Sequence, residues 1–542
     1  MIPLYKGKPW TIFSFVIALV LIVPVLVMIA GGINASTQLF SHLWQTVLPN
    51  YLKNTFFLGS LVVLLALIFG VISAALISYT NIAFKKQLRW LLLLPLAMPA
   101  YLIAYLYTDL FDYAGPVQRT LRSWFGWQTP SDYWFFDIRT LSGAAVMLAL
   151  VLFPYIYMLA RGAFEQQDQN LIRASRTLGL SLKQSFFRVA LPLARPAIAV
   201  AASLVLMETL ADFATVQYFS VNTLTTAIYD TWLGYGDLAA ANALASVLML
   251  LIFLVVVAEQ RSRTGLRHQS SRPNLTKEVI KLSLTQQLLA SSFCWLLVTF
   301  GFILPLCLLI SMAVEYSDIA QLSVLIDTGV NSIKIAVMAA TISVVIALLL
   351  GLYQRLHANK YRHLPQHLSG LGYAVPGTVL AMAMLSTFGP VDHWINDLAV
   401  KLALPSPGLI LSGSLFAIVF ALVVRFSAIA NGTIISGIKQ IPSSLDYAPA
   451  SLGAGLNKTL RKVHLPLLAP SMFIAWLLVF VEAMKELPAV LLLRPFNFET
   501  LSSQIYQLIS DEMLEQGALG AILIVIFGLL PIVLLNTKKE TS

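Results

Sequence analysis

Apolar residues run through this chain in long stretches, separated by short charged or Gly- and Pro-rich segments. A helix that crosses a bilayer core needs about 20 such residues, and about twelve stretches are long enough. The pattern therefore predicts an all-α polytopic membrane protein. The first stretch lacks a small-x-small cleavage site, so we expect a retained span rather than a signal peptide. The predicted spans are 11–30, 52–78, 91–110, 141–160, 197–218, 241–258, 288–312, 332–353, 368–388, 410–430, 470–490 and 517–535.

The composition excludes a soluble protein. Hydrophobic residues make up 58% of the 542 residues and charged residues 11%, whereas a soluble domain carries about 25% charged residues. This leaves too little polar surface to cover a water-soluble body. The chain contains two cysteines, Cys294 and Cys307, which lie in one apolar stretch without redox or metal-ligand spacing. We expect reduced thiols and no disulfide framework.

The distribution of charge predicts the orientation of the chain. When the N-terminus is placed inside, most of the 35 Lys and Arg residues fall in cytoplasmic segments, and the acidic residues show the opposite bias. We therefore expect both termini in the cytoplasm. The net charge of +10 then reflects membrane topology, so we expect a lipid bilayer and no nucleic acid as partner.

The chain is a tandem repeat. The segment from Thr177 to Pro192 has a counterpart 274 residues further on, from Ser451 to Pro466. Asn54 and Asn331 match at a spacing of 277. The repeat predicts two parallel halves of six spans each, at 1–258 and 286–542, joined by a basic cytoplasmic linker at 259–285. Parallel repeats around a central path are typical of transporters, and the alternative is a duplicated scaffold without a transport role.

The longest predicted cytoplasmic loop of each half, at 161–196 and 431–469, contains a short amphipathic segment. Leu171, Ala174 and Leu178 have the spacing of one helix face, and Leu445, Ala448 and Leu452 repeat it. Asn170 and Ser444 are the expected N-caps, and Gly179 and Gly453 the expected left-handed stops. A small-residue stripe among Arg and Lys fits a groove on a cytoplasmic partner. The alternative is a helix that lies on anionic lipid headgroups.

These loops resemble the EAA loop of binding-protein-dependent ABC importer permeases, in which a coupling helix inserts into the ATPase subunit. The resemblance rests on Gly-x9-Val-x-Leu-Pro in both halves and covers nearly the whole chain. It implies two six-helix type I importer permease halves. The Glu-Ala-Ala triplet itself is absent in both copies, which removes the usual glutamate contact, and Pro449 makes the second helix less regular. The implied coupling residues are Leu171, Arg173, Ala174, Ser175, Leu178, Gly179, Leu445, Tyr447, Ala448, Pro449, Leu452 and Gly453.

The chain contains no Gly-x-x-x-x-Gly-Lys-Ser/Thr phosphate loop. We therefore expect a transport subunit that is not an enzyme and binds no cofactor. ATP and Mg²⁺ belong on partner subunits, with one copy of a cytoplasmic ABC ATPase under each half.

Four carboxylates in or near the fifth span of each half are candidates for the substrate path. They are Glu208 and Asp212, and at the same repeat spacing Glu482 and Glu486. In a continuous helix, the i, i+4 spacing puts each pair on one face. Oxygen ligands favour a hard cation, and Tyr218, Tyr229 and Tyr506 follow nearby. The alternative is structural, with Lys485 neutralising a glutamate or the pairs holding helix ends. The sequence does not define a metal-ligand set.

The stretches that begin at Glu208 and at Lys485 resemble the ferric-iron branch of these importers. This resemblance implies that a periplasmic binding protein delivers Fe(III) to a permease in the bacterial inner membrane. The outer segments Tyr113–Arg139 and Phe388–Lys401 are its expected docking sites. Importers for thiamine, polyamines or phosphonates are alternatives. A twelve-span secondary transporter driven by an ion gradient is the alternative from another class.

Overall fold

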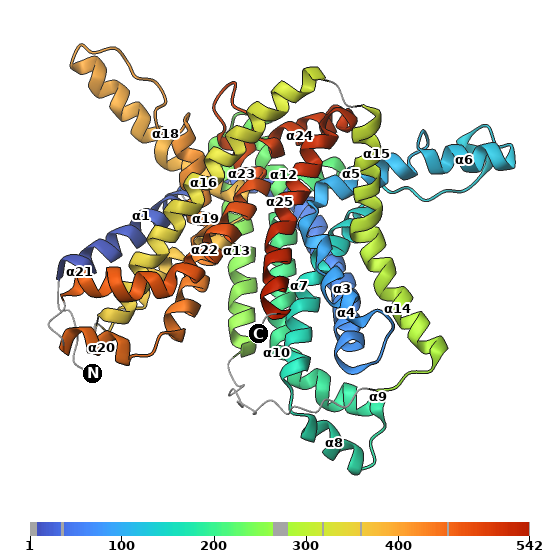
Figure 1. Ribbon diagram of the computed structural model, residues 1–542. Helices are drawn as coiled ribbons and strands as arrows, with labels where there is room; N and C mark the ends of the chain where they lie inside the picture. Colours follow the sequence, from blue (N-terminus) through green and yellow to red (C-terminus); the bar gives the residue numbers. More distant parts are fainter. Residues whose placement is uncertain are drawn as a thin grey trace. The chain divides into compact units, whose positions relative to one another are not determined.

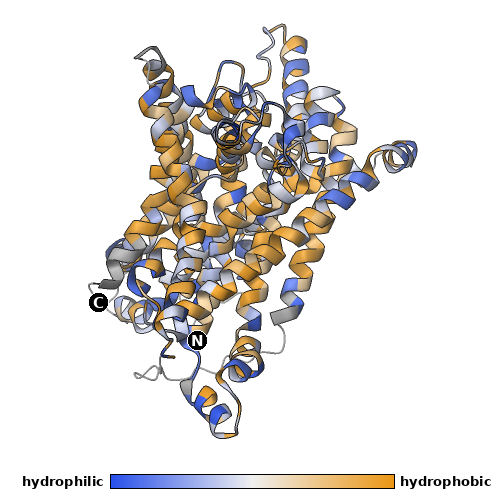
Figure 2. Cartoon of the chain, turned by 90° about the vertical axis from the view of Figure 1, so that its right-hand side faces the viewer, coloured by the Kyte–Doolittle hydropathy of each residue, from blue (hydrophilic) through white to orange (hydrophobic). Residues whose placement is uncertain are grey.

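The computed structural model describes residues 8–33, 37–263, 280–316, 319–357, 360–451 and 455–540. Within these residues, ten helical segments are long and apolar enough to cross a membrane, or up to twelve if each of two bent pairs is one span. Figure 2, coloured by hydropathy, shows that hydrophobic residues predominate along these long helices. The prediction of an all-helical protein with about twelve spans is confirmed.

The chain folds as two compact units. Unit 1 comprises Met1–Leu43, Ala227–Met249 and Asp318–Gln507, and unit 2 comprises Trp44–Thr226, Leu250–Ser317 and Leu508–Ser542. Each unit thus combines segments of both sequence halves. The first span of the first half lies in unit 1, with most of the second half. The first and last spans of the second half lie in unit 2, with most of the first half.

The helices of each unit have these bounds. Unit 1 contains α1 (Lys8–Ile33), α16 (Ile319–Leu356), α17 (Leu364–Ser369), α18 (Gly377–Lys401), α19 (Leu415–Gln440), α20 (Ser444–Ser451), α21 (Leu456–Thr459), α22 (Leu465–Lys485) and α23 (Pro488–Leu493). Unit 2 contains α3 (Leu48–Tyr79), α4 (Lys85–Leu91), α5 (Ala100–Phe111), α6 (Pro116–Phe125), α7 (Leu141–Gln166), α8 (Gln169–Thr177), α9 (Leu182–Ser185), α10 (Leu191–Ala211), α11 (Ala214–Tyr218), α14 (Leu284–Val298), α15 (Leu304–Glu315) and α25 (Leu514–Glu540).

Four further helices contain the boundaries between the units: α2 (Thr37–Thr46), α12 (Leu224–Tyr229), α13 (Leu238–Arg263) and α24 (Leu501–Ser510). Short 3-10 turns occupy Leu94–Ala97, Pro130–Asp132 and Leu371–Ala374. Turns of π-helix occupy Phe186–Ala190, Asp230–Gly234, Thr299–Ile303 and Leu460–His464.

Helices α3, α7 and α10 form the centre of unit 2 (Figure 1), and a glycine allows the close approach of α3 and α7. A Cβ added to Gly70 of α3 would lie 2.7 Å from the Cβ of Ile156 in α7, so only glycine fits. Helices α14 and α15 and helix α25, which come from the second half, complete the unit. The Tyr107 hydroxyl donates to the Phe300 carbonyl at 2.6 Å and links α5 to the α14–α15 segment.

Helices α16, α19 and α22 form the corresponding centre of unit 1, and α1 packs on α16, α17 and α18 (Figure 1). Here too a glycine allows close approach, because a Cβ on Gly437 of α19 would lie 2.3 Å from the Ser471 hydroxyl in α22. Near the start of α1, the Trp10 ring packs edge-on against His357, with ring centres 5.7 Å apart. These contacts fix the first span in unit 1.

Two predicted spans are bent rather than straight. The helical segments before and after Pro99 diverge by 91°, and those before and after Pro376 by 114°. Both prolines have extended backbone angles, and a proline cannot continue the hydrogen bonding of a preceding helix. The sequence ranges 91–110 and 368–388 treated each as one straight helix and were wrong in that respect.

Residues 264–279 of the linker lie outside the described part, and the next described segment begins at Ile280. The Ile280 amide donates to the Tyr79 carbonyl at 2.7 Å, and Asn81 donates back to the Ile280 carbonyl at 3.3 Å. The Asn81 side chain accepts from the Leu282 amide at 2.8 Å. The end of the linker is therefore fastened to the end of α3.

Candidate functional site

The first predicted coupling segment forms α8, and its exposed face matches the stripe. Leu171 is 44% and Leu178 84% exposed, and Ala174 is also exposed. Ser175 instead faces inward and donates to the Ser185 hydroxyl of α9 at 2.8 Å. Arg173 is partly buried. The stripe is thus open for contact, while the opposite face holds α8 onto its own unit.

The ends of α8 differ in one respect from the prediction. Asp168 is the N-cap, with its carboxylate accepting from the Asn170 amide at 2.9 Å, so the assignment of Asn170 as N-cap was wrong. Asp168 precedes Asn170 by two residues, and both residue types are favourable caps. Gly179 has φ +90°, the left-handed conformation expected after the helix.

The second coupling segment forms α20, which runs through Pro449 to Ser451. Ser444, the predicted N-cap, is the first residue within this helix. Tyr447 is 43% exposed, and Ala448 is exposed. Leu445 and Pro449 are partly buried. The remaining predicted positions, Leu452 and Gly453, lie outside the described residues.

After each coupling helix the chain passes through the same unusual turn. Phe186–Ala190 and Leu460–His464 are single turns of π-helix, 274 residues apart, and each leads into the Leu-Pro start of a fifth span. Turns of π-helix are rare and occur frequently at functional sites. The repeat therefore extends from sequence to local backbone geometry.

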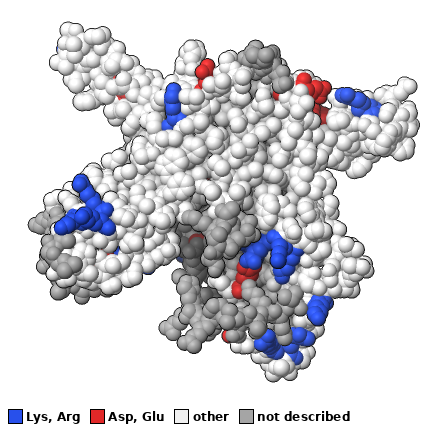
Figure 3. Space-filling model, in the orientation of Figure 1, with Lys and Arg blue, Asp and Glu red and all other residues white. Residues whose placement is uncertain are grey.

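Basic side chains lie on α4, on the first coupling segment and on the helix that follows the second. Figure 3 shows Lys and Arg over α4, α8 and α21. These are Lys85, Lys86 and Arg89, then Arg173 and Arg176, and finally Lys458. Their positions at the ends of apolar helices match the predicted cytoplasmic loops.

The fifth span of the first half ends before its second carboxylate. Glu208 lies in α10, but the helix stops at Ala211, and Asp212 has extended backbone angles of φ −67° and ψ 133°. The Asp212 carboxylate accepts from the amide and hydroxyl of Thr215, at 3.1 and 2.9 Å, and from the Val216 amide at 3.2 Å. It therefore holds the start of α11. The condition of a continuous helix, under which both carboxylates would share one face, is therefore not met.

The second half repeats this break. Helix α22 ends at Lys485, and Glu486 has φ −66° and ψ 125°. The Glu486 side chain is 6% exposed; it pairs with Arg425 of α19 at 3.0 Å and accepts from the Ala489 amide at 3.3 Å. Glu482 is 40% exposed and pairs with Lys485 at 3.3 Å. Lys485 thus neutralises Glu482, as the structural alternative predicts. Arg425, 61 residues away in the sequence, neutralises Glu486.

A polar turn braces each of these breaks, and the sequence reasoning missed it. In unit 2, the Thr225 hydroxyl donates to the Asp212 carbonyl at 2.7 Å, and Thr55 accepts from the Leu224 amide at 3.1 Å. Asn54 donates to the Asn222 carbonyl at 3.0 Å. These bonds tie the second span to the segment that follows the fifth.

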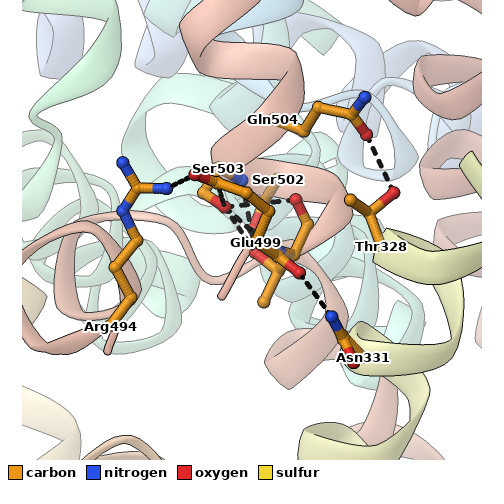
Figure 4. Close-up of polar contacts among 8 residues, drawn as sticks. Thr328, Asn331, Arg494, Glu499, Ser502, Ser503 and Gln504 are labelled. Carbon is orange, nitrogen blue, oxygen red and sulfur yellow. Dashed lines mark hydrogen bonds and ion pairs between the residues drawn. The ribbon is translucent and has the colours of Figure 1, made fainter. Parts of the chain in front are cut away.

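Unit 1 contains the same network with equivalent residues, and Figure 4 shows the part around Asn331 and Glu499. The Ser502 hydroxyl donates to the Glu486 carbonyl at 2.8 Å, and Ser332 accepts from the Leu501 amide at 2.7 Å. Asn331 donates to the Glu499 carbonyl at 3.1 Å. The sequence signal for this network is a repeated motif, Thr-Leu-Thr-Thr at 223–226 and Thr-Leu-Ser-Ser at 500–503. The two copies are 277 residues apart, as are Asn54 and Asn331.

The two polar turns differ in charge. In unit 1 Glu499 forms an ion pair with Arg494 and accepts from the Ser503 hydroxyl at 2.7 Å (Figure 4). The equivalent of Glu499 in the first half is the neutral Asn222. Burial raises the pKa of Tyr229, while nearby Arg494 acts in the opposite direction. Among the described residues, no cluster of three His, Cys, Asp or Glu side chains is placed to hold a metal ion.

Comparison with known proteins covers almost the entire chain. The chain is 26% identical over 539 residues to the Fe(3+)-transport system permease protein FbpB 2 of Haemophilus influenzae, covering 97% of both proteins. It is 24% identical to the ferric transport system permease protein FbpB of Actinobacillus pleuropneumoniae, over 95% of this chain and 75% of that protein. It is also 34% identical over 178 residues to the molybdenum transport system permease protein ModB of Escherichia coli (strain K12), covering 33% of this chain and 72% of that protein.

Two separate segments, residues 66–263 and 343–537, match one family described as binding-protein-dependent transport system inner membrane component. Each contains one predicted coupling segment, the π-helical turn that follows it and one broken fifth span. With the apolar helices, these matches identify a multi-pass membrane protein whose two halves are copies of one permease domain. The chain therefore belongs to the binding-protein-dependent transport system inner membrane component family.

Proposed function

We propose that this chain is the permease of an ATP-driven importer that carries Fe(III) into the cytoplasm. The observation that carries the proposal is the end-to-end similarity to an Fe(3+)-transport permease, which includes both halves and the linker. A fused chain of this kind supplies both sides of a transport path. ATP hydrolysis then belongs to separate subunits, because the sequence contains no phosphate loop.

The coupling helices α8 and α20 are the contacts for two copies of a cytoplasmic ATPase. Their exposed small residues, Ala174 and Ala448, allow close approach of a partner surface. Closure of the ATPase dimer pushes on these helices, and the π-helical turns pass the movement to the fifth spans. With the coupling helices facing the cytoplasmic ATPase, both termini lie on the cytoplasmic side of a bacterial inner membrane.

Two projecting segments on the other side of the membrane fit a periplasmic binding protein. In unit 2, α6 and the following loop present Trp124 and Trp134, which are 76% and 86% exposed. The loop is held by stacked Trp127 and Tyr133 rings, with centres 4.6 Å apart. In unit 1, the outer end of α18 presents Trp394, which is 64% exposed. Exposed aromatic side chains on braced supports are typical of protein-binding surfaces.

Glu208 and Glu482 are the best candidates for transient contact with the cation. Both lie in the fifth spans, one helical turn before the breaks. Asp212 and Glu486 are committed to holding the helices that follow the breaks. Carboxylate oxygen suits a hard cation such as Fe(III), and transient contact favours release over storage.

The test is solute uptake in cells that lack this chain and in the same cells with the chain restored. Radioiron uptake supplied through the binding protein should be lost and then recovered, while thiamine and spermidine uptake stay unchanged. Normal iron uptake with loss of another solute would refute the ferric assignment. Transport by the purified chain alone in liposomes, driven by an ion gradient without ATPase, would refute the importer mechanism.

A further inference from the structure

A buried ionic cluster fastens the second coupling helix to unit 1. The Nε atom of Arg355, near the end of α16, lies 2.9 and 3.0 Å from the two carboxylate oxygens of Asp446 in α20. His464 Nε2 lies 3.3 Å from the same carboxylate. The side chains of Arg355, Asp446 and His464 are 11%, 10% and 0% exposed.

The same arginine also holds the end of α19. Its Nη1 donates to the Ile438 carbonyl at 2.5 Å, and Nη2 donates to the carbonyls of Ile441 and Pro442, at 3.0 and 3.2 Å. The cluster therefore joins four elements: the second span, the end of the fourth span, the coupling helix and the π-helical turn that contains His464. Movement of α20 cannot leave these elements unaffected.

In the first half, neutral side chains link some of the corresponding elements. Tyr79, at the end of α3, donates to the Gln167 side chain at 2.8 Å, and Gln167 donates to the Ala190 carbonyl at 2.8 Å. Ala190 is the counterpart of His464, and Ile172 is the counterpart of Asp446. The coupling helix α8 itself is held through the neutral Ser175–Ser185 hydrogen bond.

These two kinds of attachment respond differently to disturbance. Separation of a buried ion pair leaves uncompensated charge, whereas separation of neutral groups loses an ordinary hydrogen bond. Movement of α20 away from its own span bundle therefore carries the cost of separating a buried ion pair.

We propose that the Arg355–Asp446 ion pair, with buried His464 against it, forms an ionic latch that positions the second ATPase contact. The inference rests on the proposed function, because it assigns a mechanical role to one of the two motor contacts. All three are positioning residues, since they act through α20. Through this latch, α20 transmits ATPase closure to the spans that the cluster joins.

The test measures each contact separately in the complete complex with its ATPase subunits and binding protein. In a background with Cys294→Ser and Cys307→Ser, a single cysteine is introduced by Ala174→Cys or by Ala448→Cys and cross-linked to the ATPase. Asp446→Asn should lower the cross-linking yield from position 448 at least about tenfold, the scale expected of an uncompensated buried charge. The yield from position 174 should stay unchanged. Asp446→Glu, which keeps the charge, should retain most of the yield from position 448.

Glu165→Gln is the matched control, because it removes an ion pair of similar length, the 2.8 Å contact with Arg89, which is partly exposed and lies in the first half. It should change neither yield. The double variant Arg355→Gln with Asp446→Asn should recover part of the yield, since neither charge is then left alone. Equal loss at both positions, or no loss at position 448, would overturn the latch. If neither position cross-links in the parent chain, the proposed ATPase contact itself fails.

Discussion

Four acidic side chains near the fifth spans divide into two kinds. Asp212 and Glu486 follow the ends of their helices and hold the amides of the next helix, and Glu486 also pairs with Arg425. Glu208 and Glu482 remain within the spans. Mutations should therefore separate a structural group from a transport group.

Glu486→Gln should reduce the amount of folded protein. It leaves Arg425 without its carboxylate, and breaking a buried pair costs about 3–5 kcal/mol. Glu482→Gln should keep the folded amount within about twofold, because an exposed ion pair contributes about 1 kcal/mol or less, but should lower iron uptake. The measurements are monodisperse yield after extraction and radioiron uptake per folded molecule. Equal yields for both variants would contradict this division.

A buried carboxylate in the outer part of α18 permits a second test. Asp392 is fully buried and accepts from the Leu411 and Ser412 amides, at 2.9 and 2.8 Å, and from the Ser412 hydroxyl at 2.6 Å. Asp392→Asn should destabilise this attachment by about 1–3 kcal/mol, because an amide cannot accept all three bonds as well. Protease cleavage within 402–413 should become faster. Asp397→Asn, at an exposed position of the same helix, is the control and should leave cleavage unchanged.

The sequence was informative about single residues where local chemistry decides. Gly179 was correctly placed in a left-handed turn. Arg425 as partner of Glu486 was not predictable, because 61 residues separate the two and only tertiary packing brings them together. The helix breaks at Asp212 and Glu486 were also missed, since both lie in apolar stretches where hydropathy continues past the end of the helix.

At the scale of elements, the repeated polar turns are the clearest link between the two halves. Each connects the second span to the segment after the fifth through an asparagine side chain and a backbone carbonyl. Hydrophobic periodicity cannot show such a contact, because its donors and acceptors lie on different helices. The unpredicted part of the candidate site therefore consists of long-range polar contacts.

Asn54→Ala and Asn331→Ala should each destabilise their unit by about 1 kcal/mol, the net contribution of one hydrogen bond. Thermal unfolding of the purified protein measures the change. Asn222→Ala is the matched control, because Asn54 bonds to the backbone carbonyl of residue 222, which the substitution keeps. Destabilisation by Asn222→Ala as large as that by Asn54→Ala would contradict the assigned bond.

The left-handed end of α8 should matter for partner binding. Gly179→Ala places a side chain at φ +90°, where strain of about 1–2 kcal/mol is expected although no atom lies close enough to clash. ATPase binding should weaken by about fivefold, equivalent to about 1 kcal/mol. Gly162→Ala in α7, also in open space but within a helix, should not weaken it. A pull-down titration compares the two variants.

At the scale of the whole molecule, the sequence predicted the number and duplication of the spans but not their grouping. The halves at 1–258 and 286–542 are continuous in sequence, whereas each compact unit contains segments of both. Hydropathy cannot show which unit a span joins, because a span that packs with its own half and one that packs with the other half are equally apolar.

This grouping predicts that neither half is stable alone. A fragment of residues 1–263 lacks α14, α15 and α25, on which unit 2 depends, and its α1 lacks α16, α17 and α18. It should be degraded in cells, and co-expression with residues 280–542 should restore both fragments. Immunoblotting of membranes follows their amounts. Stable accumulation of the first fragment alone would show that the exchanged helices are dispensable.

The proposed function is transport of Fe(III) powered by a separate ATPase. The most direct measurement is radioiron accumulation in liposomes that contain this chain with its ATPase subunit and receive iron-loaded binding protein. Radioiron accumulation should require ATP, the ATPase and the binding protein together. It should be lost when Glu208→Gln and Glu482→Gln are combined. Accumulation that persists without ATP, or ATP-driven uptake of another solute with none of iron, would contradict it.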